Sequence, residues 1–319
     1  MEPSAPRQQC ADAVLMIRPA AFGYNPDTAR TNTFQQPLEA RAADPGKVAQ
    51  QARAEFERLA QALASEGVSV ITVDDTPDPR KPDAVFPNNW VSFHQDGTVV
   101  LYPMESGSRR CERRQEVIEQ VTGRLGFKVT HLLDLTHYEG QGMFLEGTGS
   151  LVLDHAQRVA YACASPRTHP ALVGEWASEL HYEPVVFSAA NSGGVPLYHT
   201  NVLLFIGARA AVIGSEAIAA ADRPRVLERL RASGREVFEI GHAEIAQFAG
   251  NLLELGTWDE ALGDSRVLVM SEAARRALEP EVFARLSGCT DAVLAVPVPT
   301  IERLGGGSVR CMLAEVFRA

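Results

Sequence analysis

A glycine run near the end of the chain leads into a cysteine, in the segment Gly305-Gly306-Gly307-Ser308-Val309-Arg310-Cys311. Glycines allow a backbone to approach another group closely, because no side chains intervene. A thiol presented beside such a run is a candidate nucleophile. Most free cysteines, however, behave as small, buried apolar side chains. The segment alone leaves both interpretations of Cys311 open.

Four other polar residues begin segments that repeat the pattern found after Cys311. They are Asn89, Glu146, His199 and Asn251, and each precedes a short apolar run. The five starts, at positions 89, 146, 199, 251 and 311, are 57, 53, 52 and 60 residues apart. Internal periods of this length indicate repeats or propellers. In a closed ring such starts meet at one end of the central channel, where a thiol, an imidazole and a carboxylate form the usual set for covalent catalysis at an sp2 carbon.

Each repeat predicts two strands, a helix and a third strand. In the first repeat we expect strands at 89–93, 99–102 and 128–133 and a helix near 113–125. The next three predict strands at 151–153, 159–163 and 184–187, at 202–206, 210–213 and 237–240, and at 252–255, 266–270 and 292–296. The fifth has only its first strand, and residues 13–73 supply the rest. Five ββαβ-like units closed by the two termini are thus predicted, although the alternation also fits a doubly wound α/β fold.

The repeats also define the expected domain organisation. Residues 1–12 are predicted to form a flexible N-terminal extension, and residues 13–319 a single catalytic domain. Asp44 and Pro45 predict the start of a long helix, as its N-cap and first residue. The polar loop at 20–37 is long for a compact domain, and such loops are often functional. We expect it to act as a lid.

The composition indicates a globular protein with a small-molecule partner. The chain has 319 residues, 45% of them hydrophobic, and a formal net charge of -10. Because binding to phosphates requires a basic face, nucleic acid is not an expected partner. The arginines between positions 109 and 114 are expected on one helix as a local cluster. No apolar run approaches the roughly 20 residues of a membrane span, so no membrane partner is expected. A homodimer is compatible with the sequence.

The cysteines and histidines predict neither a disulfide framework nor a metal site. The five cysteines are scattered and lack paired zinc-ligand spacing, which favours a reducing, cytoplasmic setting. The eight histidines form no HExxH motif, and Gly147-Thr148-Gly149 lacks the third glycine of a dinucleotide loop. We therefore expect no metal and no cofactor. Structural roles are expected for the four remaining cysteines: Cys10, Cys111, Cys163 and Cys289.

Several segments together resemble the guanidine-modifying enzymes, the superfamily of arginine deiminases, dimethylarginine dimethylaminohydrolases and amidinotransferases. The segments are 82–89 (PDAVFPNN), 145–147 (LEG), 199–202 (HTNV) and 305–312 (GGGSVRCM). Their order and spacing, together with 14–25 (VLMIRPAAFGYN) and 87–94 (PNNWVSFH), are most similar to the citrulline-utilisation hydrolase, or citrulline ureidase, branch. The resemblance implies an α/β fold of the pentein (α/β-propeller) type, with five ββαβ units around a central channel, and a cofactor-free hydrolase of non-peptide C–N bonds.

The resemblance and the repeat positions imply one catalytic scheme. The Cys311 thiolate attacks the carbon of a guanidino or ureido group, and His199 gives a proton to the leaving nitrogen and later takes one from water. Glu146 is expected to hydrogen-bond His199 or a substrate nitrogen and to favour the imidazolium. Backbone around Ser308 and Val309 is a candidate for holding developing charge. A histidine in a turn and a solvated glutamate are the alternatives for His199 and Glu146.

The substrate class follows from two neutral residues. Family members that grip a guanidinium commonly carry carboxylates where this chain has Asn89 and Asn201. An amide offers both a donor and an acceptor, which suits a neutral urea; the alternative is that both asparagines only make turns. Further candidates for substrate binding are Asp83, Phe86, Asn88, Arg167 (for an α-carboxylate) and the lid residues Phe22 and Asn25. Tyr102 replaces a second carboxylate-binding arginine of dimethylarginine hydrolases.

Three interpretations of function remain at this point. The first is hydrolysis of citrulline to ornithine, ammonia and carbon dioxide in arginine metabolism. The second is a dimethylarginine or arginine-type hydrolase, or an amidinotransferase. The third is a pentein that binds a partner without catalysis, which the joint presence of Cys311, His199 and Glu146 disfavours.

Overall fold

Short strands arranged in threes build the fold. The computed structural model describes residues 8–37, 44–259 and 263–317, and within these ranges the strands form four sheets. One sheet has the order β2-β1-β15-β3-β4-β5. Its strands are β1 (Ala13–Arg18), β2 (Ser69–Asp74), β3 (Val91–Phe93), β4 (Thr98–Leu101), β5 (His131–Asp134) and β15 (Ala314–Val316).

The other three sheets have three strands each. They are β6 (Leu151–Asp154), β7 (Val159–Cys163) and β8 (Glu183–Phe187); β9 (Leu204–Ile206), β10 (Ala210–Ile213) and β11 (Glu236–Glu239); and β12 (Leu253–Asp259), β13 (Gly263–Ser271) and β14 (Ala292–Val296). In each, the first two strands pair antiparallel and the last two pair parallel. The six-stranded sheet contains the same arrangement twice, in β3-β4-β5 and β15-β1-β2.

The two ends of the chain share one sheet, as the sequence predicted. β15 pairs antiparallel with β1, with Ala13 opposite Val316, and parallel with β3. No closed sheet joins the four within the part of the chain that the structure describes. The mixed α/β class is therefore confirmed, whereas a closed five-unit ring stays a prediction.

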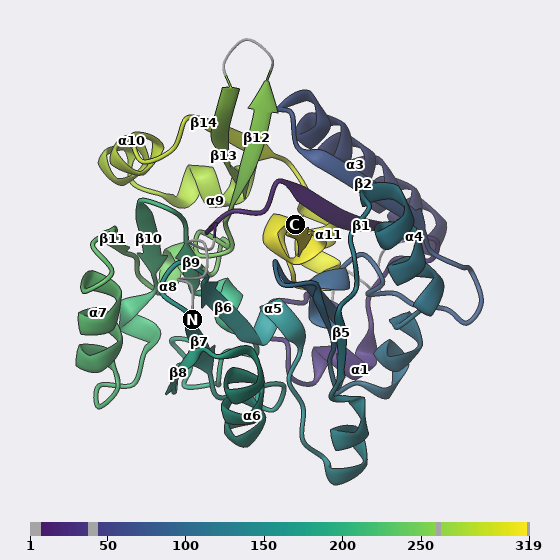
Figure 1. The fold of residues 1–319 in the computed structure, drawn as a ribbon, viewed down its shortest axis with the longest axis horizontal. Helices are drawn as coiled ribbons and strands as arrows, with labels where there is room; N and C mark the ends of the chain where they lie inside the picture. The colour runs from purple at the N-terminus through teal and green to yellow at the C-terminus, as the bar shows by residue number, and fades with distance from the viewer. Residues whose placement is uncertain (1–7, 38–43, 260–262, 318–319) are drawn as a thin grey trace.

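Helices cover the outer faces of the sheets (Figure 1). The longest, α3 (Pro45–Ser65), begins as predicted: the Asp44 side chain accepts from two backbone N–H groups, and Pro45 occupies the first turn. The face that α3 turns inward carries Val48, Ala52, Phe56, Leu59 and Leu63, all buried. The other longer helices are α4 (Gln115–Leu125), α6 (Pro170–Leu180), α7 (Arg223–Arg231), α9 (Glu272–Ala277), α10 (Pro280–Ser287) and α11 (Pro299–Gly305).

One-turn helices occupy the starts of four of the repeats, and the sequence analysis did not predict them. They are η1 (Pro87–Asn89), α5 (Gly147–Ser150), η4 (Thr200–Val202) and η6 (Val309–Met312). Asn89 ends η1, Glu146 and His199 cap α5 and η4, and Cys311 lies within η6. At most one residue separates each of these turns from the strand that follows it. The repeated local geometry brings these polar side chains together.

The expected single helix over the arginine cluster is wrong. Arg109 and Arg110 lie on the 3-10 helix η2 (Gly107–Glu112), and Arg113 and Arg114 link it to α4. The strand predicted at 128–133 also has different bounds, because β5 is shorter and begins later, at His131. Within η2, Arg109 is buried.

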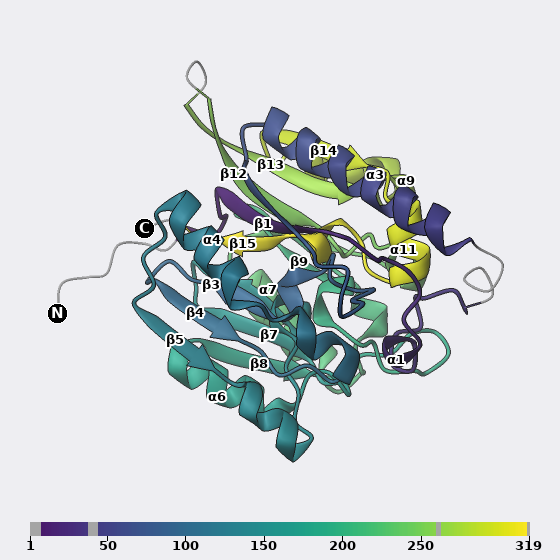
Figure 2. The ribbon, with the colours of Figure 1, turned by 90° about the vertical axis from the view of Figure 1, so that its right-hand side faces the viewer.

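The predicted lid lies over the glycine run. The loop at 20–37 contains the short helix α1 (Pro26–Ala29), and Figure 2 shows α1 at the same end of the molecule as α11. Asn32 Nδ2 donates to the carbonyl of Gly306 at 3.1 Å, and Gln35 Nε2 donates to that of Gly305 at 3.1 Å. The loop is therefore bound directly to the segment that carries Cys311.

Part of the predicted N-terminal extension, residues 1–7, lies outside the described residues. Gln9 Nε2 donates to the carbonyl of Leu153 at 3.0 Å, and Cys10 is buried. Of the helices that the structure describes, none is both long and apolar enough to cross a membrane.

Candidate active site

Cys311 is buried among amide groups. Its Sγ lies 3.3 Å from Asn251 Nδ2 and 3.5 Å from Asn201 Nδ2. The Asn251 amide is fixed, because its Oδ1 accepts from the backbone N–H of Arg310 at 3.1 Å and its Nδ2 also donates to the Asn201 carbonyl at 2.9 Å. An N–H donor beside sulfur suits a thiolate. Cys311 thus borders an apolar core cluster on one side and two amide donors on the other.

The glycine run is required by close packing. A Cβ added at Gly305 or Gly307 would lie 2.9 or 3.0 Å from the ring of Phe86. Gly306 has a φ of 64°, in the left-handed region, and its added Cβ would lie 2.6 Å from Asn32 Nδ2. The sequence-based interpretation of these glycines as points of close approach is confirmed.

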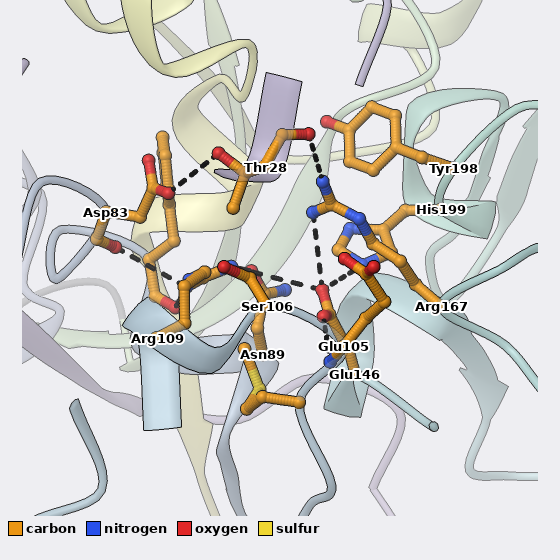
Figure 3. Close-up of polar contacts among 12 residues, drawn as sticks. Thr28, Asp83, Asn89, Glu105, Ser106, Arg109, Glu146, Arg167, Tyr198 and His199 are labelled. Atoms are coloured by element: carbon orange, nitrogen blue, oxygen red, sulfur yellow. Dashed lines mark hydrogen bonds and ion pairs between the residues drawn. The ribbon is translucent and has the colours of Figure 1, made fainter. Parts of the chain in front are cut away.

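His199 and Glu146 form a buried pair (Figure 3). His199 Nε2 lies 2.9 Å from Glu146 Oε2. Burial would raise the pKa of Glu146, but Arg167, His199 and Arg109 together lower it to about 2. Burial lowers the pKa of His199 to about 4, although Glu146 acts in the opposite direction. Glu146 thus favours the imidazolium, as expected, but burial outweighs it and favours the neutral imidazole in the free site.

The charge on Glu146 fixes the tautomer of His199. An ionised carboxylate only accepts hydrogen bonds, so Nε2 of His199 must carry the proton. Nδ1 is then unprotonated and available as a base. A Cβ added at Gly149 would lie 2.6 Å from this Nδ1 and 2.5 Å from Asn89 Nδ2, so the absence of a side chain at Gly149 makes room for both groups.

Arg109 is a site residue that the sequence analysis missed. Its Nη1 donates to Asn89 Oδ1 at 2.8 Å and lies 4.0 Å from Glu146 Oε2. Its other donors reach Glu112 and the carbonyl of Phe86. Glu112 and the other nearby carboxylates raise the pKa of Arg109 despite its burial. Its sequence signal was a cluster of arginines, which does not reveal that one of them points inward.

Arg167 joins the loop at 20–37 to the pair of His199 and Glu146. Nη1 lies 3.4 Å from Glu146 Oε2, Nη2 donates to the carbonyl of Thr28 at 2.6 Å, and Nε donates to Thr31 Oγ1 at 2.8 Å. The guanidinium also lies over the ring of Tyr198, 5.1 Å from its centroid. Arg167 is thus buried inside the site, and lid groups occupy its donors.

Asp83 is the second polar group under the lid. Its Oδ2 accepts from Asn25 Nδ2 at 2.8 Å and from Thr28 Oγ1 at 3.0 Å, whereas no partner reaches its buried Oδ1 among the described residues. Burial raises the pKa of Asp83, and Arg109 opposes this effect. The carboxylate keeps one free acceptor inside the site.

These groups line a small cavity of about 10 Å³. Its size is close to the minimum that holds one water molecule. The lining residues are Thr28, Asn32, Gln35, Asp83, Phe86, Asn89, Arg109, Arg167, Tyr198, His199, Gly305, Gly306, Gly307 and Cys311. An amino-acid substrate therefore requires the lid to move.

Most of the sequence-predicted residues gather at this cavity. Glu146 lies behind His199, Asn201 contacts Cys311, and Asn25 contacts Asp83. Phe22 packs beside Gly305. Asn88 does not line the cavity; its Nδ2 donates to Thr148. The sequence analysis placed Asn251 at a repeat start but gave it no role, whereas its Nδ2 contacts Cys311.

Comparison with known proteins identifies the family. The chain matches the family described as N,N dimethylarginine dimethylhydrolase, eukaryotic, over residues 18–318. The chain belongs to this family. It is accordingly a hydrolase of carbon–nitrogen bonds other than peptide bonds, within the guanidine-modifying superfamily. A search of curated protein sequences gives no match.

Solved structures of related enzymes share the fold. ArgZ, an arginine dihydrolase from the ornithine–ammonia cycle in cyanobacteria, superposes with a TM-score of 0.72 at 17% identity, over 96% of this chain and 41% of ArgZ. The present chain thus spans about two fifths of full-length ArgZ. The N-terminal domain of a substrate-bound cysteine-to-serine variant of ArgZ gives 0.70 at 17% identity, over 96% of this chain and 98% of that domain.

A dimethylarginine dimethylaminohydrolase is similar as well. A histidine-to-glycine variant, solved as an adduct with S-methyl-L-thiocitrulline, gives a TM-score of 0.62 at 18% identity, over 95% of this chain and 99% of that one. At these identities the superpositions establish a common fold.

Proposed function

We propose that the protein hydrolyses the ureido group of citrulline, giving ornithine, ammonia and carbon dioxide. The observation that carries this proposal is the presence of neutral amides, Asn89 and Asn201, beside Cys311 and His199 in one buried site. A neutral urea fits such amides better than a guanidinium does, because a cation in a buried site needs a carboxylate partner.

The first step is attack on the ureido carbon. Nδ1 of neutral His199 accepts the proton of the Cys311 thiol, and the sulfur forms a bond to the carbon. The C=O electron pair moves onto oxygen. Asn251, which donates to sulfur in the free site, holds the thiolate in place.

Collapse of the tetrahedral species expels ammonia. The imidazolium of His199 gives its proton to the leaving NH2 group, and an S-carbamoyl thioester-like intermediate remains on Cys311. Water, deprotonated by Nδ1, then cleaves the C–S bond and returns the thiol. The released N-carboxy-ornithine loses carbon dioxide, so citrulline and one water yield ornithine, ammonia and carbon dioxide.

Glu146 and its two arginines support the proton shuttle. Glu146 holds Nε2 of His199 and stabilises the imidazolium once it forms. Arg167 and Arg109 keep Glu146 ionised. Without them burial would favour the protonated carboxyl group, and the tautomer of His199 would be lost.

The amino-acid end of the substrate is proposed to replace lid contacts. Arg167 exchanges the Thr28 carbonyl and Thr31 hydroxyl for the substrate α-carboxylate, which accepts a guanidinium fork more strongly. The Oδ1 of Asp83, which has no partner among the described residues, accepts a hydrogen bond from the substrate α-ammonium group. Phe22 and Asn25 then close over the substrate as the lid returns.

A guanidino substrate such as arginine is the second candidate. The buried, partly unpartnered carboxylate of Asp83 favours a cation, and the similar ArgZ is an arginine dihydrolase. Dimethylarginine is a further candidate substrate, because the family that the chain matches is described as a dimethylarginine dimethylhydrolase. The position of Asp83 among lid residues, rather than beside Cys311, supports its use at the amino-acid end.

Three further features are proposed with the activity. The recurring three-stranded arrangement and the pairing of β15 with β1 support a five-unit ring, formed by one catalytic domain over residues 13–319. The unpaired cysteines support a cytoplasmic setting. A homodimer is the proposed alternative to a monomer, and sedimentation would decide between them.

One assay tests the proposal. The purified protein is incubated separately with citrulline, arginine and dimethylarginine, and ornithine, ammonia and dimethylamine are measured. We expect ornithine and ammonia in equal amounts from citrulline, and loss of both in Cys311→Ser. Turnover of arginine or dimethylarginine without turnover of citrulline would refute the citrulline assignment.

A further inference from the structure

The lid borders two spaces of very different size. Asn32 and Gln35 line the cavity of the candidate active site, which measures about 10 Å³. Thr33, Phe34 and Gln36 line a groove of about 440 Å³ instead. Phe34 is the aromatic residue among these three, so it is the one that can pack firmly on the opposite wall of the groove.

Phe34 packs against Phe248, which comes from that opposite wall. The two ring centroids are 5.0 Å apart, and the ring planes are inclined by 36°. Phe248 is buried, and Phe34 is partly buried against the same core. Aromatic pairs at this distance contribute more than the area they bury. Phe34 therefore anchors the lid to the segment that carries Phe248.

The backbone of Phe248 is in an unusual conformation. Its φ of 61° lies in the left-handed region, which bulky side chains seldom adopt. Such a conformation costs free energy and persists only where the surroundings fix it. Here the N–H of Phe248 donates to the carbonyl of Ile245 at 2.9 Å, and the ring packs on Phe34. Loss of the ring contact removes one of these restraints.

The residues after Phe248 lead directly to the candidate nucleophile. The carbonyl of Phe248 accepts from the backbone N–H of Asn251 at 2.8 Å, and Asn251 Nδ2 lies 3.3 Å from Cys311 Sγ. A Cβ added at Gly250 would lie 2.7 Å from the carbonyl oxygen of Val202, so the backbone between them passes tightly against the end of η4. Because the segment has little room, a shift of Phe248 reaches the amide beside the sulfur.

We propose that Phe248 is a positioning residue, through which closure of the lid places Asn251 beside Cys311. This inference rests on the proposed role of Cys311 as the nucleophile. With the lid closed, Phe34 holds Phe248 in its strained conformation, and Asn251 donates to the sulfur. When the lid opens for substrate, Phe34 leaves and the backbone of Phe248 relaxes. The thiolate is then fully stabilised only while water is excluded from the site.

The test follows alkylation of Cys311 by iodoacetamide across a range of pH, without substrate, by peptide mass spectrometry. Access past the lid changes the maximal rate, whereas stabilisation of the thiolate sets the pH at which half that rate is reached. We expect Phe34→Ala and Phe248→Ala each to raise the half-maximal pH by about one unit, as loss of a hydrogen bond to a charged group does.

The double variant and a neighbouring residue provide the controls. If Phe34 and Phe248 act through one contact, the double alanine variant should shift the half-maximal pH no further than either single variant. Gln247→Ala is the matched control, because Gln247 lines the same groove but is exposed, and its profile should not move. If Phe248→Ala does not fold, Phe248→Leu keeps most of the apolar volume, and a smaller shift in the same direction is expected.

The outcomes separate this inference from the proposed hydrolysis. A raised maximal rate with an unchanged half-maximal pH in the Phe248 variants would show that Phe248 only helps to close the lid. A shift that is absent from Phe34→Ala, or additive in the double variant, would overturn the coupling to the lid. Because no substrate is used, a shared, non-additive shift supports the inference even if citrulline is not hydrolysed; that failure would refute only the proposed hydrolysis.

Discussion

Asn251 connects the backbone that precedes Cys311 with the sulfur of Cys311 itself. Its Oδ1 accepts from the N–H of Arg310 at 3.1 Å, and its Nδ2 lies 3.3 Å from Sγ. The residue thus sets the position of η6 and presents a donor to the nucleophile at the same time. Nδ2 also donates to the backbone carbonyl of Asn201 at 2.9 Å, so only one orientation of the amide satisfies all three contacts.

Replacement of Asn251 should affect the chemistry of the thiol. We expect Asn251→Ala to lower kcat by about 10- to 100-fold, because a donor to the thiolate and the support of η6 are both lost. Asn251→Asp should be more damaging, since it places a carboxylate against sulfur. The rate of alkylation of Cys311, followed by peptide mass spectrometry, should fall in parallel with kcat. An unchanged alkylation rate would contradict the role assigned to Asn251.

The pH dependence of catalysis should report a neutral His199. Since the pKa of His199 is about 4, the base in the free enzyme stays unprotonated down to that value. We expect the acid limb of kcat/KM to have its midpoint near pH 4. A midpoint near the ordinary value of 6.5 would instead indicate an imidazolium in the free enzyme.

The titrations of His199 and Glu146 should each contribute a loss of stability in acid. The folded-state pKa of His199 is depressed from 6.5 to about 4, so the unfolded chain binds more protons as pH falls through that range and stability is lost there. Glu146, depressed from 4.5 to about 2, adds a second loss below pH 4.5. Urea unfolding at a series of pH values measures both. In His199→Gln the loss between pH 6.5 and 4 should be smaller than in the parent.

A methyl group at Gly149 should inactivate the enzyme without unfolding it. The added Cβ would lie 2.5 Å from Asn89 Nδ2 and 2.6 Å from His199 Nδ1, so both side chains must shift. We expect kcat/KM to fall by about 100-fold or more in Gly149→Ala. Gly174→Ala is the control, because nothing lies within 4 Å of its added Cβ within helix α6. Equal activities of the two variants would contradict this account of Gly149.

The lid should loosen when its contacts to the glycine run are removed. Gln35→Ala and Asn32→Ala each delete hydrogen bonds to the carbonyls of Gly305 or Gly306. We expect a several-fold rise in KM and faster alkylation of Cys311 in the absence of substrate. Gln36→Ala keeps the backbone N–H that donates to the carbonyl of Arg303, and it should leave both KM and the alkylation rate unchanged. Protection of Cys311 that is equal in all variants would show that other contacts close the site.

The sequence indicated the candidate trio more clearly than the groups that position it. Cys311, His199 and Glu146 occupy equivalent places in repeats, and repetition is visible along a chain. The contact of Arg109 with Asn89 depends on where a 3-10 helix ends and α4 begins, a boundary that composition does not fix.

The lid contacts were beyond sequence reasoning for a different cause. Arg167 and Thr28 are 139 residues apart, and neither lies in a periodic segment that would predict their meeting. The length of the loop indicated a functional role, but it did not indicate that the carbonyl of Thr28 would accept from Arg167. Likewise, the protonation state of His199 depends on burial, which three-dimensional packing decides.

The position of β15 between β1 and β3 has a consequence for biosynthesis. Residues 314–316 insert between two strands that leave the ribosome hundreds of residues earlier, and Cys311 lies three residues before them. A chain that has made every other sheet still has an unfilled gap in this one. Formation of the candidate site around Cys311 is therefore expected to await the pairing of β15 with β1 and β3.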